Sequence, residues 1–125
     1  MDYRLLGVGE EMIASMTWLV VVFAHFVGDY ALQSSWMAVE KIEDGYVRFA
    51  HATIWAGCIV VALLYSQIGF NQDAWYIGLV SFWLVSTHYL MDDTPHPNRL
   101  TLFFDQGLHL MCALLPWALL FIWGT

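Results

Sequence analysis

The sequence predicts an all-α protein, an integral membrane four-helix bundle with a polar His/Asp site near one membrane face. Its composition is 60% hydrophobic and 12% charged, whereas a soluble domain typically carries about 25% charged residues. Four apolar segments are each roughly 18 to 22 residues long, which is enough to cross a hydrocarbon core of about 30 Å. Histidines and aspartates recur near the ends of these segments, where such side chains are costly in lipid and are typical of functional sites.

The chain is expected to form a single transmembrane domain over residues 1–125, because the four segments leave no room for a soluble domain. Each segment must be helical in lipid so that its backbone groups bond one another. The four predicted spans cover about residues Met12–Gln33, Val47–Ile68, Ala74–Met91 and Phe104–Trp123.

Local features predict how these spans bend and connect. The segment Ser34–Tyr46 mixes charged and apolar residues and is expected to form a short interfacial helix, with Gly45 as its C-terminal stop. Pro116 lies inside the fourth span, where we expect a local kink. Gly28 is expected to let two helices approach closely. The first apolar run is expected to remain as a span, because its acidic flank does not fit a cleavable signal peptide.

Charge and cysteine content exclude two broad classes of protein. The formal net charge is −7, and the four basic residues are too few for a nucleic-acid interface. Cys58 and Cys112 fall in the middle of spans and outside any CxxC motif, so no disulfide framework is expected. We interpret both as small packing residues, with soft metal ligation as the alternative.

Seven polar side chains form the candidate site. Three His–Asp pairs have the spacing i, i+4, which places both members of a pair on one helix face, and a fourth histidine begins the second span. Because successive spans run in opposite directions, all seven lie toward the same membrane face, from near the interface to roughly 13 Å below it. The site is expected to contain His25, Asp29, His51, His88, Asp92, Asp105 and His109.

The chemistry of these residues suits one or two divalent metal ions. A carboxylate in lipid needs a proton, an ion-pair partner or a metal, and no Lys or Arg lies beside these aspartates within the spans. Zn²⁺ is favoured because it binds His and carboxylate ligands, and Mn or Fe would also suit. One of Asp29, Asp92 and Asp105 would act as a catalytic base or orient a ligand histidine. A proton or ion relay and a purely structural polar core are the alternatives.

Longer motifs surround the polar residues, and the most specific are HxxGDYxLQ and DQxxH. The matching stretches are His25–Gln33, Trp36–Ala38, Lys41, His51, His88–Asp92 and Phe104–His109. Together they resemble a family of small bacterial and phage membrane proteins labelled domain of unknown function 3307. The resemblance covers nearly the whole chain and implies four spans and this polar site, with a pattern similar to that of membrane-bound metal-dependent hydrolases. Within these stretches we interpret Gln33, Lys41 and Gln106 as residues that bind substrate or orient ligands.

The leading hypothesis is a metal-dependent hydrolase near the cytoplasmic face of a bacterial inner membrane, acting on a lipid or an amphipathic phosphate ester. Lys41, Arg48 and Arg99 lie in two loops on one side and Arg4 alone on the other, which places both termini in the periplasm. A cation or proton transport component is one alternative and predicts polar residues at several depths. A non-enzymatic interaction protein with a structural metal site is the other and predicts a closed coordination shell. The expected partners are the lipid bilayer and, in a homo-oligomer, further copies of the chain.

Overall fold

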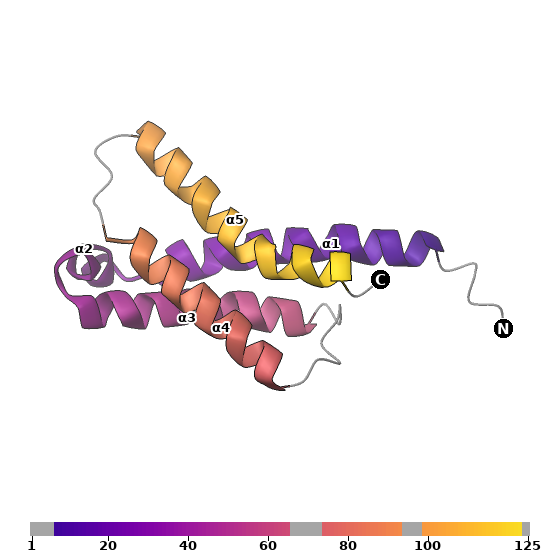
Figure 1. Cartoon of the computed structure of the whole chain (residues 1–125). Coiled ribbons are helices and arrows are strands. Elements are labelled where there is room, and N and C mark those ends of the chain that lie inside the picture. The colour runs from indigo at the N-terminus through magenta and orange to yellow at the C-terminus, as the bar shows by residue number, and fades with distance from the viewer. Residues whose placement is uncertain (1–6, 66–73, 94–98, 124–125) are drawn as a thin grey trace.

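The computed structural model describes residues 7–65, 74–93 and 99–123, and every secondary-structure element in these ranges is a helix (Figure 1). The all-α prediction is therefore confirmed for the described residues. Arg4, on which the predicted orientation partly depends, lies outside them. The elements are α1 (Gly7–Phe26), η2 (Val27–Ala31), α2 (Ser35–Glu43), α3 (Gly45–Tyr65), α4 (Ala74–Met91) and α5 (Arg99–Trp123).

Helix α3 is central, because it contacts α1, η2, α2 and α4. Figure 1 shows α1 and α3 lying alongside each other, with α4 and α5 crossing them obliquely. The end of α1, the start of α3 and the end of α4 lie toward the same end of the molecule. The alternating helix directions expected from the sequence are therefore present, and they bring the polar residues to one end of the bundle.

The first predicted span is helical from α1 through η2, but the helix changes type before it ends at Ala31. Helix α1 runs directly into the π-helix η2, where the Leu32 N–H donates to the Val27 carbonyl five residues earlier at 3.0 Å. Beyond Ala31 the chain bends by 86° into α2. The Ser34 hydroxyl caps α2 by accepting a hydrogen bond from the Met37 N–H at 3.1 Å, which is the role that serine favours at a helix start.

A short helix is present in the first connection, as expected, but Gly45 is not its stop. Helix α2 ends at Glu43, and Gly45 is the first residue of α3. The reason lies in Asp44, whose Oδ1 accepts hydrogen bonds from the Tyr46 N–H at 2.7 Å and the Val47 N–H at 3.3 Å. These contacts satisfy backbone donors of the first turn, so a new helix begins here.

Among the described residues, one helix is long and apolar enough by itself to cross a membrane. It covers Gly45–Leu64, with 20 residues and a mean hydropathy of 1.8. Met16–Ala31 meets the same criteria together with Ser35–Glu43, but the pair is sharply bent, and Leu100–Pro116 is a shorter apolar helix. Four membrane spans therefore stay a prediction.

Apolar side chains pack between the helices next to the polar residues. They lie toward the start of α4. The buried core includes Val21, Trp55, Ile59, Leu63, Leu84 and Ala113, and Cys58 packs against it. Gly28 permits the close approach expected of it, because an added Cβ would lie 2.8 Å from the Cα of Trp55. This contact brings the backbone of η2 against α3. It therefore sets how deeply the residues that follow Gly28 lie within the bundle.

Candidate metal centre

Five of the seven predicted site residues come together in one buried cluster. One aspartate comes from η2, one histidine from α3, a histidine and the following aspartate from the end of α4, and one histidine from α5. The histidine side chains are fully buried and the two aspartates are 5% exposed. The five residues of this cluster are Asp29, His51, His88, Asp92 and His109.

The ligand-type atoms of the cluster lie close to the spacing of a metal coordination shell. His51 Nε2 is 3.2 Å from Asp29 Oδ1 and 3.3 Å from Asp92 Oδ2. His88 Nε2 is 3.8 Å from Asp29 Oδ1 and 3.6 Å from Asp92 Oδ2, and His109 Nε2 is 3.8 Å from Asp92 Oδ1. Zn–ligand bonds of about 2.0–2.1 Å put neighbouring ligand atoms of a tetrahedron about 3.4 Å apart.

Two overlapping groups of residues in the cluster could each hold a metal ion. One consists of Asp29, His51 and His88, and the other of His88, Asp92 and His109. In each group, one ligand atom from every residue lies within 4.8 Å of the others. Because His88 belongs to both, its ring nitrogen is the atom on which the cluster is centred.

Four buried imidazole nitrogens of the cluster have no hydrogen-bond partner among the described residues: the Nδ1 atoms of His51 and His88, and the Nε2 atoms of His88 and His109. Of these, the two Nε2 atoms face carboxylates. The nearest carboxylate contacts, at 3.6 Å and 3.8 Å, are beyond hydrogen-bond range. A buried polar atom without a partner costs about 1–3 kcal/mol. A cation between the rings and the carboxylates would satisfy both.

Asp105 lies behind His109 and fixes the protonation of its ring. His109 Nδ1 is 2.8 Å from the Asp105 backbone carbonyl and 3.3 Å from Asp105 Oδ2, so Nδ1 carries the proton and donates it. In a neutral imidazole the lone pair is then on Nε2, which faces Asp92. Carboxylate and carbonyl groups orient histidine ligands in this way in many metal sites.

His25 lies beside the cluster, and both of its ring nitrogens are engaged. Trp55 Nε1–H donates to His25 Nδ1 at 2.9 Å, so His25 Nε2 carries the proton and donates to Gln106 Oε1 at 2.9 Å. This arrangement leaves His25 no lone pair for a metal ion. Asp29, four residues later, contacts His51 in the cluster instead, with Oδ1 3.2 Å from His51 Nε2.

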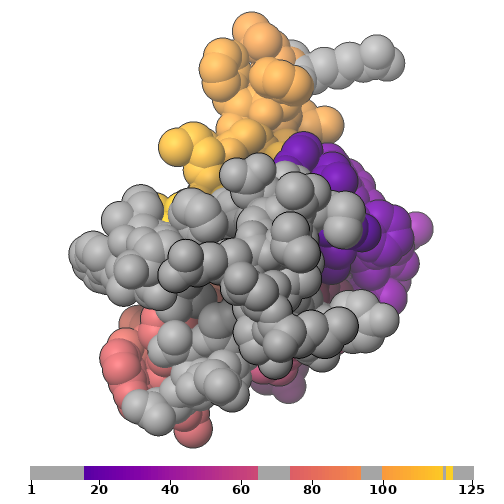
Figure 2. Space-filling model, turned by 90° about the vertical axis from the view of Figure 1, so that its right-hand side faces the viewer, coloured from indigo at the N-terminus to yellow at the C-terminus, as the bar shows by residue number. Residues whose placement is uncertain are grey.

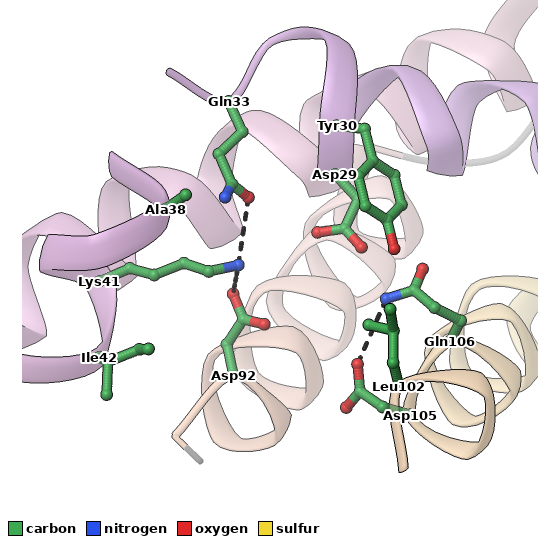
Figure 3. A pocket seen from close by; sticks show the side chains of 10 residues that line it. All are labelled: Asp29, Tyr30, Gln33, Ala38, Lys41, Ile42, Asp92, Leu102, Asp105 and Gln106. Atoms are coloured by element: carbon green, nitrogen blue, oxygen red, sulfur yellow. Dashed lines mark hydrogen bonds and ion pairs between the residues drawn. The ribbon is translucent and has the colours of Figure 1, made fainter. Parts of the chain in front are cut away.

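A polar pocket of about 220 Å³ opens beside the cluster, and all three predicted catalytic aspartates line it (Figure 3). Gln106 on α5 forms part of the wall, and its Nε2 donates to Asp105 Oδ2 at 3.2 Å. The pocket therefore joins the metal-ligand cluster, through Asp29 and Asp92, to the side chains that surround it.

Lys41 and Gln33 form the opposite wall of the pocket, as Figure 3 shows. Lys41 Nζ is 2.7 Å from Asp92 Oδ2 and donates to Gln33 Oε1 at 3.2 Å. Lys41 is the one Lys or Arg among the described pocket-lining residues, so three carboxylates share a single ammonium group. The aspartates outnumber the basic groups in this lining, and a divalent cation bound in the cluster would offset that imbalance.

Trp55 is a site residue that the sequence reasoning missed. Its ring stacks on His88, with the ring centroids 4.3 Å apart and the planes 15° apart, and its indole N–H bonds to His25. It follows His51 by four residues, and this i, i+4 spacing on α3 was the available signal.

Arg48 was also missed as a residue that positions the pocket wall. Its Nε donates to the Lys41 carbonyl at 2.8 Å and its Nη2 to the Ile42 carbonyl at 2.7 Å, while Nη1 bonds to Asp93. The guanidinium lies over the Tyr89 ring, 5.3 Å from its centroid. Arg48 thereby satisfies carbonyls near the end of α2 and holds Lys41 in place. No spacing in the sequence indicated this contact.

One known protein family matches most of the chain. A family model described as "Protein of unknown function (DUF3307)" matches residues 17–124. The chain belongs to this family. The matched range contains every residue of the cluster and of the pocket wall, so the whole candidate site lies within the family's shared region. No curated protein and no solved structure matches the chain.

Proposed function

We propose that the protein is a membrane-embedded metal-dependent hydrolase. The observation that carries the proposal is the buried cluster, in which the Nε2 atoms of His88 and His109 face carboxylates without hydrogen bonds among the described residues. The metal ion would be Zn²⁺, with Mn or Fe as alternatives, because imidazole and carboxylate ligands at these spacings suit it. Its proposed ligands are Asp29, His51, His88, Asp92 and His109.

The proposed reaction is hydrolysis of an ester in the polar pocket. A metal ion with an open position lowers the pKa of bound water and so supplies a nucleophile near neutral pH. Asp29 Oδ1 makes the contacts within the cluster, and Asp29 also lines the pocket, so its second oxygen, Oδ2, is the proposed proton acceptor. Asp92 also reaches both, but one of its oxygens is held by Lys41. Asp105 keeps His109 in the metal-binding tautomer.

The proposed location is a bacterial inner membrane with four spans and both termini in the periplasm. Large apolar side chains are exposed on different helices, including Phe23 on α1, Phe82 on α4 and Phe103 on α5, which are 70%, 73% and 74% exposed. Such a surface suits lipid better than water. The charged helix α2, which carries Lys41, would lie at the cytoplasmic interface.

Two features favour hydrolysis over the alternatives. A transport pathway needs polar groups along the bundle, but the core beyond the cluster is built from apolar residues such as Ile59, Leu63 and Leu84. A structural metal site needs a closed shell, but the pocket of about 220 Å³ beside the cluster leaves room for water and substrate. The combination of a buried ligand set and an open side is characteristic of catalytic metal sites.

The function is tested with purified protein in lipid nanodiscs, stripped of metal and then supplied with Zn²⁺. Release of phosphate would be measured from a long-chain phosphatidic acid and from soluble 4-nitrophenyl phosphate. Asp92→Asn and Asp93→Asn are a matched pair, because both carboxylates are ion-paired but one is 5% and the other 63% exposed.

We expect metal-dependent turnover that falls by at least about 100-fold in Asp92→Asn and persists in Asp93→Asn. Absence of metal-dependent turnover, or equal activity in the two variants, would contradict the proposed function.

A further inference from the structure

An apolar groove runs along the outside of the polar pocket. It has a volume of about 510 Å³ and lies between the end of α1 with η2 and the first half of α5. Its walls include Phe26, Phe103 and Leu110, and Gly107 leaves part of its floor without a side chain. The groove is not filled by the described side chains, although it adjoins the most polar part of the molecule.

The groove and the pocket share part of their walls. Tyr30, Leu102 and Gln106 line both of them. Figure 1 shows the first half of α5 diverging from α1, and Figure 2 shows the same segment standing out from the rest of the molecule. The polar pocket therefore opens sideways, between α1–η2 and α5, into an apolar surface channel.

The two walls of the pocket differ in chemistry. Figure 3 shows Lys41 and Gln33 on one side and Tyr30, Leu102 and Gln106 on the other, next to the groove. An ammonium group has three N–H donors, and those of Lys41 have two described partners, Gln33 Oε1 and Asp92 Oδ2. The third donor suits an anionic oxygen such as that of a phosphate.

From this arrangement we propose that the substrate is a phosphate-bearing membrane lipid that enters from the side. Its hydrocarbon chain lies in the groove against α5, and its phosphate head occupies the pocket near Lys41. The inference rests on the proposed function and selects a lipid over a soluble ester. A chain in the groove stays in contact with the bilayer, so the head can reach the cluster without transfer of apolar surface into water.

Gly107 provides a way to block the groove without disturbing the fold. A Cβ added at Gly107 meets no atom within 4 Å, and the same is true at Gly78 on α4. Gly107→Phe would place a ring in the groove, whereas Gly78→Phe would add the same ring where it lines neither the groove nor the pocket. Both changes replace glycine inside a helix, so their effects on helix propensity are matched.

The probe is a phosphatidic acid with a photoreactive diazirine on its acyl chain, incorporated into nanodiscs with the full chain. We expect cross-links to residues of α5 near Gly107, reduced by roughly 10-fold or more in Gly107→Phe and unchanged in Gly78→Phe. In the hydrolysis assay, Gly107→Phe is expected to slow turnover of the long-chain lipid but not of 4-nitrophenyl phosphate.

Cross-linking needs no turnover, so it tests the lipid site separately from the hydrolase. Cross-links that map elsewhere, or that persist at full yield in Gly107→Phe while that variant remains folded, would overturn the lateral lipid site. Cross-links at α5 that depend on Gly107, with no hydrolysis of either substrate, would support the lipid site and overturn the hydrolase.

Discussion

Along α3 and α4, buried side chains of two kinds occupy adjacent parts of the same helices. In one part Ile59, Leu63 and Leu84 are almost fully buried among other apolar residues. Further along the same helices, His51 and His88 are equally buried but lie among carboxylates. The side chains of both parts are buried, so the difference between them is in whether the buried atoms have partners.

The apolar part is satisfied by its own contacts, and the polar part is not. Dispersion and apolar burial need no specific partner atom, whereas the Nε2 atoms of His88 and His109 have none among the described residues. Trp55 marks the boundary, because its ring stacks on His88 while the core residues pack around it. We infer that the apolar part stabilises the bundle and that the polar part is organised to hold a ligand.

The largest effect is expected from His88→Ala, which removes the nitrogen shared by both possible ligand groups. Affinity for Zn²⁺, measured by competition with a chelator, should fall by more than the roughly 10–100-fold that loss of an outer partner costs. Thr87→Ala is the control, because its hydroxyl bonds to backbone carbonyls of α4 and to the Cys112 side chain, none of which belongs to the cluster. Unchanged Zn²⁺ affinity in His88→Ala would contradict the inference that the polar part is organised to hold a ligand.

Leu84→Ala changes the apolar part instead. Leu84 is fully buried, so its truncation should lower the free energy of unfolding by about 2–5 kcal/mol, measured by denaturation in detergent. Leu79→Ala, on an exposed face of the same helix, should change it by about 0.5 kcal/mol or less. We expect the metal content per folded molecule to be unchanged in Leu84→Ala. If the metal content fell in proportion to the loss of stability, the apolar and polar parts of the helices would not be separable.

The smallest effect is expected from Asp105→Asn. The backbone carbonyl of Asp105 still accepts the His109 Nδ1–H at 2.8 Å, while the change affects the carboxylate's contacts with the His109 ring and with Gln106 Nε2. Zn²⁺ affinity should fall by roughly 10-fold, the low end for outer partners. Asp93→Asn, with a carboxylate that is exposed and paired to Arg48, should leave the affinity unchanged. A fall as large as that in His88→Ala would make Asp105 a ligand.

The sequence was sufficient to predict that the polar residues converge, because helix direction and residue spacing are fixed by simple geometry. Alternating helices place His51, His88 and His109 at the same end of the bundle whatever their side-chain packing. The i, i+4 rule also predicted the pairs His88–Asp92 and Asp105–His109, whose side chains approach to 3.6 Å and 3.3 Å.

The sequence could not predict how the first span ends. The change from α-helix to π-helix at Val27 depends on which backbone hydrogen bonds form, and several patterns are compatible with the same apolar residues. His25, near the end of α1, is hydrogen-bonded to Trp55 and Gln106, so the ligand set inferred from spacing was larger than the cluster. The contacts of Arg48 with α2 are likewise tertiary and leave no periodic signal.

The most direct test of the account is the metal content of the detergent-purified protein by elemental mass spectrometry, beside an Asp29→Ala, His109→Ala double variant. The double variant removes one ligand from each of the two possible groups. We expect at least one equivalent of Zn, Mn or Fe per wild-type chain, and we expect this metal to be lost from the folded double variant. A well-folded wild-type protein that neither carries nor takes up a metal ion would contradict it.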